Sequence, residues 1–250
     1  MSELLVSSPN LSEAWARAFL RVAQTKKREL GPLVVTVDTV FGVQERADIR
    51  GLLCAHLARC NETPIDTVAN TIFPMSLWNR SSSRHVLFGR FDTIWPKMKK
   101  NLANRNGTYF RRFTAFGEGK FNQIEHVLAT WSQGNHRRSA LQLAVFDPLI
   151  DHTHQRQRGF PCLHQVAVVP GSDGLLTLTA FYATQTLFEK AYGNYLGVAR
   201  LGQFIAQELG MVLAGITCVA SLAMLTQSEG VNKNRILFAE KLAALVPERP

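Results

Sequence analysis

Cysteine is scarce in this sequence of 250 residues. The four that occur are unevenly spaced and form no CxxC pair: Cys54, Cys60, Cys162 and Cys218. That pattern excludes the paired thiols of a common zinc site and the framework of a small disulfide-bonded domain. We therefore expect free thiols, and a special role for any one of them has to come from its surroundings.

Long apolar runs are missing as well. No uninterrupted run reaches the about 18 residues that a membrane-spanning helix needs, and the opening segment MSELLVSSPNLSEAW lacks the basic start and apolar core of a signal peptide. Charged residues make up 19% of the chain and hydrophobic residues 46%, which excludes a disordered or coiled-coil class. We expect a single cytoplasmic domain over residues 1–250 that has no membrane partner.

Acidic residues are outnumbered by basic ones, and the formal net charge is +9. This excess favours anionic partners, whether nucleotide phosphates, nucleic acid or acidic proteins, and does not choose among them. The basic segments KMKK and NRN lack the interleaved aromatic residues of a platform for single-stranded nucleic acid, so nucleic acid is possible but not favoured. Three histidines near Cys162 lack carboxylate or thiol partners at ligand spacing, and we expect no metal site there: His152, His154 and His164.

Hydrophobic periodicity predicts the order of the helices and strands. Helices are expected over 12–27 with Ser12 as the cap, 46–60, 121–135, 194–210 and 232–246. Strands are expected over 31–43, 139–148, 161–170, 174–185 and 211–225, the third and fourth forming a hairpin. Residues 61–106 mix prolines, serines and lysines, which predicts loops and short helices. The sum is an α+β domain built on one sizeable sheet.

The segment QRQRGFPCLHQVAV, residues 155–168, contains the most interesting cysteine. Cys162 follows a proline directly and begins a stretch with apolar residues at every second place. A lone cysteine beside apolar residues is usually buried and inert, whereas an attacking cysteine must present its thiolate to a substrate. The residues of this segment by themselves are compatible with both roles.

Five segments occur in an order that points to one family: GTYFRRF, NQIEHVLATWSQGNHRRSALQLAVFDP, FPCLHQVAV, LTLTAFYATQ and GNYLGVARLGQFIAQELG. Together they run from about Asn104 to Leu213, and their order resembles the thymidylate synthase and deoxycytidylate hydroxymethylase superfamily. The resemblance implies a thymidylate synthase-like three-layer arrangement, in which helices cover one large mixed sheet and the sheet mediates a homodimer.

The resemblance also implies a chemistry. Cys162 would be the nucleophile that adds to C6 of a pyrimidine nucleotide, and Tyr109 would assist proton transfer at the ring. The attacking group has to be a thiolate. The one-carbon donor would be 5,10-methylenetetrahydrofolate, and the product a nucleotide methylated or hydroxymethylated at C5.

Five further residues match substrate-binding positions of the family. Arg137 and Arg138, in HRRS, match an adjacent arginine pair that reaches the nucleotide phosphate from the partner subunit, and Asn194 matches an asparagine that reads the polar edge of the base. Gln165 lies near the position at which the family has a glutamine after its cysteine, although it is closer to the cysteine here. Arg28, in TKKREL, matches a flexible phosphate-binding loop, although the glycines of that loop are missing here.

The sequence also departs from the family. FYATQT has neither the arginine nor the serine that follow the tyrosine of the second hairpin strand, and ASLAML has nothing polar where a histidine and a tyrosine would hold the sugar. No glutamate in residues 46–74 can be assigned as the catalytic one. These losses indicate a substrate other than plain deoxyuridylate.

Other roles remain open for the same residues. Tyr109 could equally be an aromatic residue packed in the core, and Asn194 could equally cap a helix. The arginine pair could equally lie in a solvent-exposed connection between a helix and a strand. A second hypothesis is therefore a dimeric sensor or regulatory subunit that binds a nucleotide without chemistry. A third is a basic nucleic-acid-binding protein, whose affinity would fall steeply with salt.

Overall fold

One mixed sheet forms the centre of the molecule. The computed structural model describes residues 4–134, 137–154, 160–226 and 232–246, except for the side chains of 232–236. The sheet has seven strands in the order β1-β3-β7-β6-β5-β4, with β2 added at β7. The strands are β1 (Leu5–Ser8), β2 (Glu29–Leu30), β3 (Leu33–Asp38), β4 (Gln142–Ala144), β5 (Leu163–Pro170), β6 (Leu175–Thr186) and β7 (Val212–Met224).

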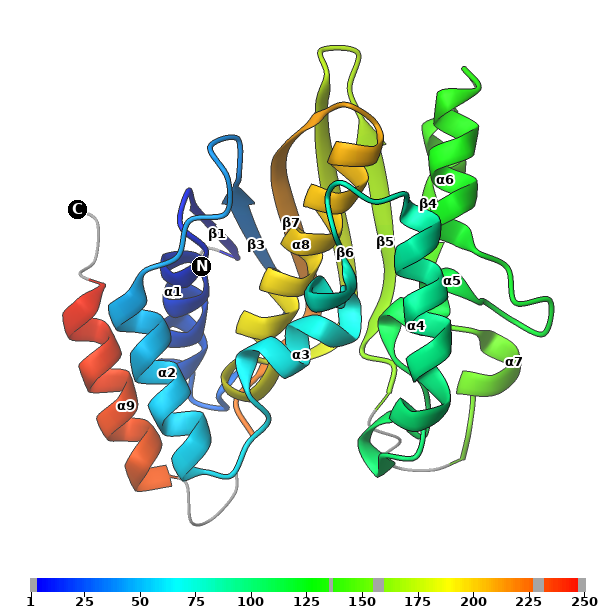
Figure 1. Ribbon diagram of the computed structural model, residues 1–250. Coiled ribbons are helices and arrows are strands. Elements are labelled where there is room, and N and C mark those ends of the chain that lie inside the picture. Colours follow the sequence, from blue (N-terminus) through cyan, green and yellow to red (C-terminus); the bar gives the residue numbers. More distant parts are fainter. Residues whose placement is uncertain (1–3, 135–136, 155–159, 227–231, 247–250) are drawn as a thin grey trace.

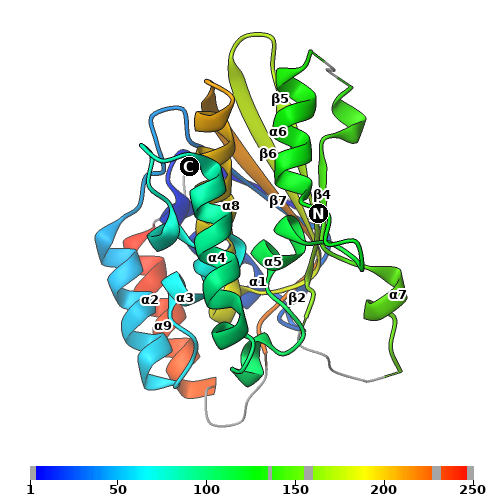
Figure 2. The same ribbon diagram turned by 45° about the vertical axis from the view of Figure 1, so that its right-hand side comes forward.

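The longer helices pack on one side of this sheet (Figures 1 and 2). The α-helices are α1 (Leu11–Ala23), α2 (Ala47–Arg59), α3 (Ile65–Ile72), α4 (Arg84–Met98), α5 (Tyr109–Thr114), α6 (Gln123–Ser132), α7 (Pro148–Asp151), α8 (Tyr192–Glu208) and α9 (Asn232–Leu245). Short turns of other helix types are η1 (Met75–Leu77), η2 (Leu102–Asn104), η3 (Arg138–Ala140) and η4 (Leu187–Ala191). The prediction of one large mixed sheet with helices is confirmed.

The C-terminal half follows the sequence prediction closely. β5 and β6 pair antiparallel as a hairpin, whereas β6 and β7 run parallel and are joined by α8. Most residues of α8 are buried, because this helix lies between the sheet and α3. A Cβ atom at Gly197 would lie 2.8 Å from the carbonyl oxygen of Ala69, so glycine permits the close approach of the two helices.

Two details at the N-terminus differ from the prediction. The cap of α1 is Asn10, whose side chain accepts hydrogen bonds from the amides of Ser12 and Glu13. Ser12 is instead buried inside the helix, where its hydroxyl lies 2.8 Å from that of Tyr192. The strand β1 was not predicted, because LVSS is short and owes its extended form to parallel pairing with β3.

The prediction of loops and short helices for residues 61–106 was wrong for α4, which is 15 residues long. Ser83 caps it, and Pro96 is tolerated because it lies in the last turn. A helical apolar stripe is present at Leu87, Phe88 and Phe91. The stripe was not recognised in the sequence, because its three residues are outnumbered by the lysines, arginines and serines around them.

The opposite face of the sheet is uncovered among the described residues. Along β6 the side chains alternate between buried Leu176, Leu178 and Ala180 and exposed Thr177 and Phe181. Such alternation is typical of a sheet that has one face packed on a core. In the same described part of the chain, none of the helices has both the length and the apolar character that crossing a membrane would require.

Candidate functional site

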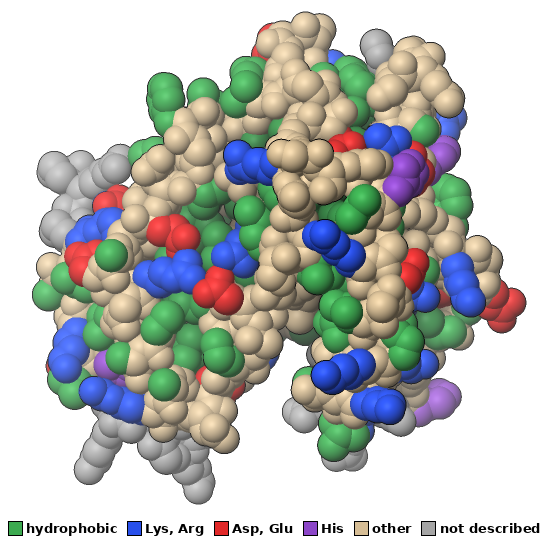
Figure 3. All heavy atoms as spheres, viewed as in Figure 1, with side chains coloured by type: hydrophobic (Ala, Val, Ile, Leu, Met, Phe, Trp, Pro, Cys, Tyr) green, Lys and Arg blue, Asp and Glu red, His purple; other side chains and the backbone are tan. Residues whose placement is uncertain are grey.

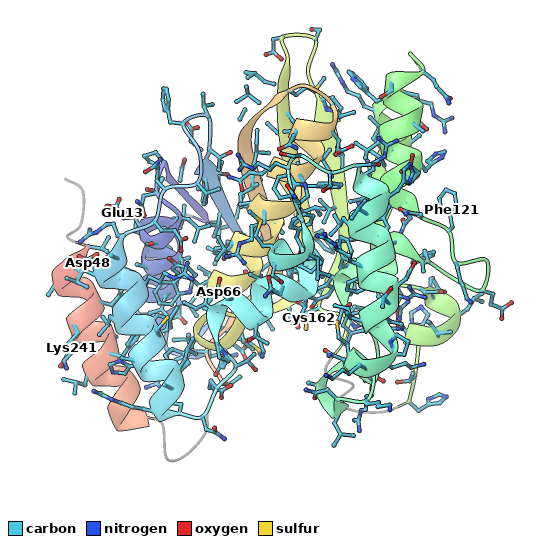
Figure 4. The ribbon with its side chains drawn as sticks, viewed as in Figure 1. Glu13, Asp48, Asp66, Phe121, Cys162 and Lys241 are labelled. Atoms are coloured by element: carbon cyan, nitrogen blue, oxygen red, sulfur yellow. The ribbon has the colours of Figure 1, made fainter. Side chains whose placement is uncertain are left out.

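Cys162 lies directly before β5, at one end of the sheet. Its carbonyl oxygen accepts a hydrogen bond of 3.0 Å from the amide of Ala183, which fixes it beside β6. The residue is half-buried, unlike Cys218, which is enclosed in the core. Figure 4 labels Cys162 near the lower end of β5, and Figure 3 shows the surface hollowed just below, between the lobe of α3 and the lobe of α4. Cys162 is therefore only partly enclosed, although it packs against the hydrophobic core.

Thr184 on β6 shares this site. Its hydroxyl donates a hydrogen bond to Sγ of Cys162 at 3.8 Å. Side chains two residues apart on a strand point to the same face of the sheet, so Thr184 lies on the face of the fully buried Tyr182, under the helix layer. Thr184 is nevertheless exposed. The helices thus leave the end of β6 uncovered beside the thiol.

Tyr109 approaches the thiol from α5. Thr108 caps this helix by accepting a hydrogen bond of 3.3 Å from the amide of Arg111, and Tyr109 is its first residue. The Tyr109 ring packs on Phe160, with 5.1 Å between centroids. Burial, and then the nearby Cys162 thiol, raise the pKa of Tyr109 above its ordinary value. The phenol consequently keeps its proton at neutral pH and can donate a hydrogen bond.

A buried ion pair holds the wall of this site in place. Arg112 donates to Asp151 at 2.9 Å and to the carbonyl oxygen of Val145 at 3.3 Å, and the Asp151 side chain is fully enclosed. The Arg112 guanidinium also lies 5.4 Å from the ring centre of Phe160. Arg112 therefore links α5 to the residues that precede Cys162.

Asn194 is the third residue of α8 and does not cap it. The turn before it, η4, has a π-helical hydrogen-bond pattern, and no side chain caps α8. Asn194 is buried. The neighbouring Tyr195 donates to Gln185 at the end of β6, which places the start of α8 at the same end of the sheet as Cys162. The capping role of Asn194 is therefore excluded.

Arg137 and Arg138 lie at the other end of the sheet. Nε of Arg138 donates to the carbonyl oxygen of Pro170 at 3.1 Å, and both side chains are exposed. Pro170 ends β5 and Cys162 precedes its start, so the two points are about 26 Å apart along the strand. Within one chain the arginine pair is too distant to bind a phosphate of a nucleotide at Cys162.

The other two predicted residues lie apart from the thiol. Gln165 is exposed on the uncovered face of the sheet, opposite Phe181. Arg28 is at the correct end of the sheet, because its carbonyl oxygen accepts from the amide of Leu225 after β7. However, Arg28 lines a separate cavity of about 340 Å³ between α1 and α9, whose wall is mostly apolar. The structure brings Cys162 and Tyr109 together and leaves Gln165 and Arg28 outside their contact.

Sequence reasoning missed two polar residues at this end of the sheet. Thr184 was not singled out, and nothing in the sequence signalled its contact with Cys162. Glu189 is buried in η4 and accepts a hydrogen bond from the hydroxyl of Thr226. A charged residue at the junction of a strand and an apolar helix is a signal that could have found Glu189.

Comparison with protein-family models gives no matching family, and comparison with curated proteins gives no match. The functional interpretation therefore depends on the residues of this chain and on their geometry.

Proposed function

We propose that the protein is a pyrimidine nucleotide C5 methyl- or hydroxymethyltransferase of the thymidylate synthase-like type, working as a homodimer. The observation that carries the proposal is the half-buried Cys162 thiol at the end of β5, in hydrogen-bonding contact with Thr184 and next to Tyr109. A purely structural cysteine needs neither an uncovered side nor a polar neighbour, as Cys218 in the core illustrates.

The chain's own residues divide the work. The Cys162 thiolate forms an Sγ–C6 bond while the electron pair of the C5–C6 double bond moves onto C5, which becomes the nucleophile toward a one-carbon electrophile. The electron pair left by the C5 proton would break the bond between the one-carbon unit and its carrier. A hydride or hydroxide would then add to that carbon, and re-formation of the C5–C6 double bond would expel the thiolate. Because its phenol stays protonated, Tyr109 acts in this scheme by orienting the water that accepts the C5 proton. Asn194 orients the base through its buried amide.

The aromatic rings of Tyr109 and Phe160 provide a wall that suits flat heterocycles such as a pyrimidine or a pteridine. A bound folate would supply the one-carbon unit and, for methyl transfer, the electrons that reduce it.

The uncovered face of the sheet supports a homodimer. Its central rows carry hydroxyl and apolar side chains without charges: Thr36, Thr217 and Thr179 in one row, and Val34, Val219 and Phe181 in the next. Uncharged faces of this kind suit packing of sheet on sheet. A second copy docked there would bring its own Arg137 and Arg138 toward the Cys162 site of the first copy. Within one chain these arginines lie at the far end of β5 from Cys162.

The register of β6 and β7 supports a substrate other than plain deoxyuridylate. Thr184 pairs with Leu222, so a small hydroxyl from FYATQT and an alkyl side chain from ASLAML stand side by side in the two segments that lack the family's phosphate arginine and sugar-binding groups. We propose a pyrimidine nucleotide that differs in its base or sugar.

Release of the C5 hydrogen tests this function. We expect the protein to release tritium from a [5-³H]pyrimidine nucleotide, tested over dUMP, dCMP, UMP and CMP with and without methylenetetrahydrofolate. Cys162→Ala is expected to release none, and Cys54→Ala, which changes an exposed cysteine on α2, is expected to match the wild type. Equal release by wild type and Cys162→Ala would refute the function.

A second candidate function is a nucleotide sensor, which the Thr184–Leu222 pair also favours because polar contacts to the substrate are fewer there. In that case calorimetry would give tight nucleotide binding that is unchanged in Cys162→Ala, no folate binding and no tritium release.

A further inference from the structure

The contact between Thr184 and Cys162 is the basis of the further inference. The two residues lie on neighbouring segments whose alignment is set by the backbone hydrogen bond from Ala183 to Cys162. The 3.8 Å from Oγ1 to Sγ is within reach of a hydrogen bond to sulfur. Since an exposed threonine hydroxyl is free to rotate, its proton can point at the sulfur.

We propose that Thr184 is a positioning residue for the nucleophile: its hydroxyl donates to the sulfur, stabilises the thiolate and directs it toward the incoming ring. This inference rests on the proposed function and extends it to a residue to which the family resemblance gives no role.

The electrostatic surroundings of the sulfur support this role. Among the described residues, no arginine or lysine side chain makes a hydrogen bond or ion pair with Cys162, and the hydroxyl of Thr184 is its hydrogen-bonding side-chain neighbour. Reactive cysteines usually have a cation or a helix N-terminus nearby to stabilise the thiolate. The hydroxyl of Thr184 contributes to that task as a neutral donor, because hydrogen bonds to an ionised acceptor are stronger than those to a neutral one.

This arrangement also has a consequence for the substrate. Among the described residues the side-chain donor to the sulfur is a neutral hydroxyl, so we expect a second copy to supply the groups that bind the phosphate. The exposed Arg137 and Arg138 of a second copy meet that need.

Thiol alkylation tests the proposal without any nucleotide or folate. We would measure the rate at which iodoacetamide modifies Cys162, followed by mass spectrometry of its peptide, over a range of pH. Thr184→Val keeps the shape and removes the donor, Thr184→Ser keeps the donor, and Thr177→Val changes an exposed threonine on the same strand.

We expect Thr184→Val to lower the rate at pH 7 about fivefold and to move the rate–pH curve to higher pH, because the thiolate loses a hydrogen bond worth about 1 kcal/mol. Thr184→Ser and Thr177→Val should behave as the wild type does. An unchanged rate in Thr184→Val, or an equal loss in Thr184→Ser, would overturn the proposal. If the alkylation rates follow the prediction while no nucleotide reacts, the positioning role stands and the proposed function fails.

Discussion

A mixture of two inactive variants is expected to recover activity. Cys162→Ala lacks the nucleophile, and the double variant Arg137→Ala/Arg138→Ala lacks the phosphate-binding pair. The two groups lie about 26 Å apart along β5 in one chain, so a complete site would combine residues of two copies. After random exchange of subunits, half of the dimers are heterodimers, and each heterodimer has one intact site of two. We therefore expect about a quarter of the wild-type tritium release.

The control for this experiment is a mixture of two wild-type preparations that carry different affinity tags, because co-purification of the two tags shows that subunits exchange. Size-exclusion chromatography with light scattering establishes that both variants are dimeric. Dimers that exchange and yet recover no activity would contradict the composite site, and a monomeric wild-type protein would contradict the homodimer itself.

The second large effect concerns stability. Arg112→Met is expected to lower the free energy of unfolding by about 3–5 kcal/mol, because it removes the guanidinium that donates to the enclosed Asp151 carboxylate. The measurement is urea denaturation followed by circular dichroism, with the slope of the transition checked for a constant value.

The neighbouring arginine is a matched control. Arg111 pairs with Asp92, whose side chain is 64% exposed, so Arg111→Met is expected to cost less than about 1 kcal/mol. Adding Asp151→Asn to Arg112→Met should restore part of the loss, because the buried charge is then removed. Equal costs for Arg111→Met and Arg112→Met would show that the Arg112–Asp151 pair does not hold this wall together.

The periodicity of the sequence predicted most of the sheet and its layer of helices. Strands such as β6 and β7 are long and rich in apolar residues, and α8 is apolar on nearly all sides, so local pattern and tertiary burial agree. β1 and α4 were missed for opposite reasons. The four residues of β1 depend on pairing with β3, whereas the apolar stripe of α4 is narrow beside its many polar residues.

The candidate site was predictable only in its main residue. The proline and the apolar alternation around Cys162 identified the start of a strand, and the structure places the residue there, half-buried. The contact with Thr184 joins residues 22 positions apart, and it depends on the register of β5 and β6 and on a bulge after Leu163. Local sequence patterns do not determine such register details.

The most direct measurement of the central claim is the mass of the protein after incubation with a 5-fluoropyrimidine nucleotide and methylenetetrahydrofolate. Fluorine at C5 cannot leave as a proton would, so the Sγ–C6 bond should persist. The account predicts a mass increase that maps to the peptide of Cys162 and vanishes in Cys162→Ala. A nucleotide that binds without adding mass, or an adduct on Cys54 or Cys60 instead, would contradict it.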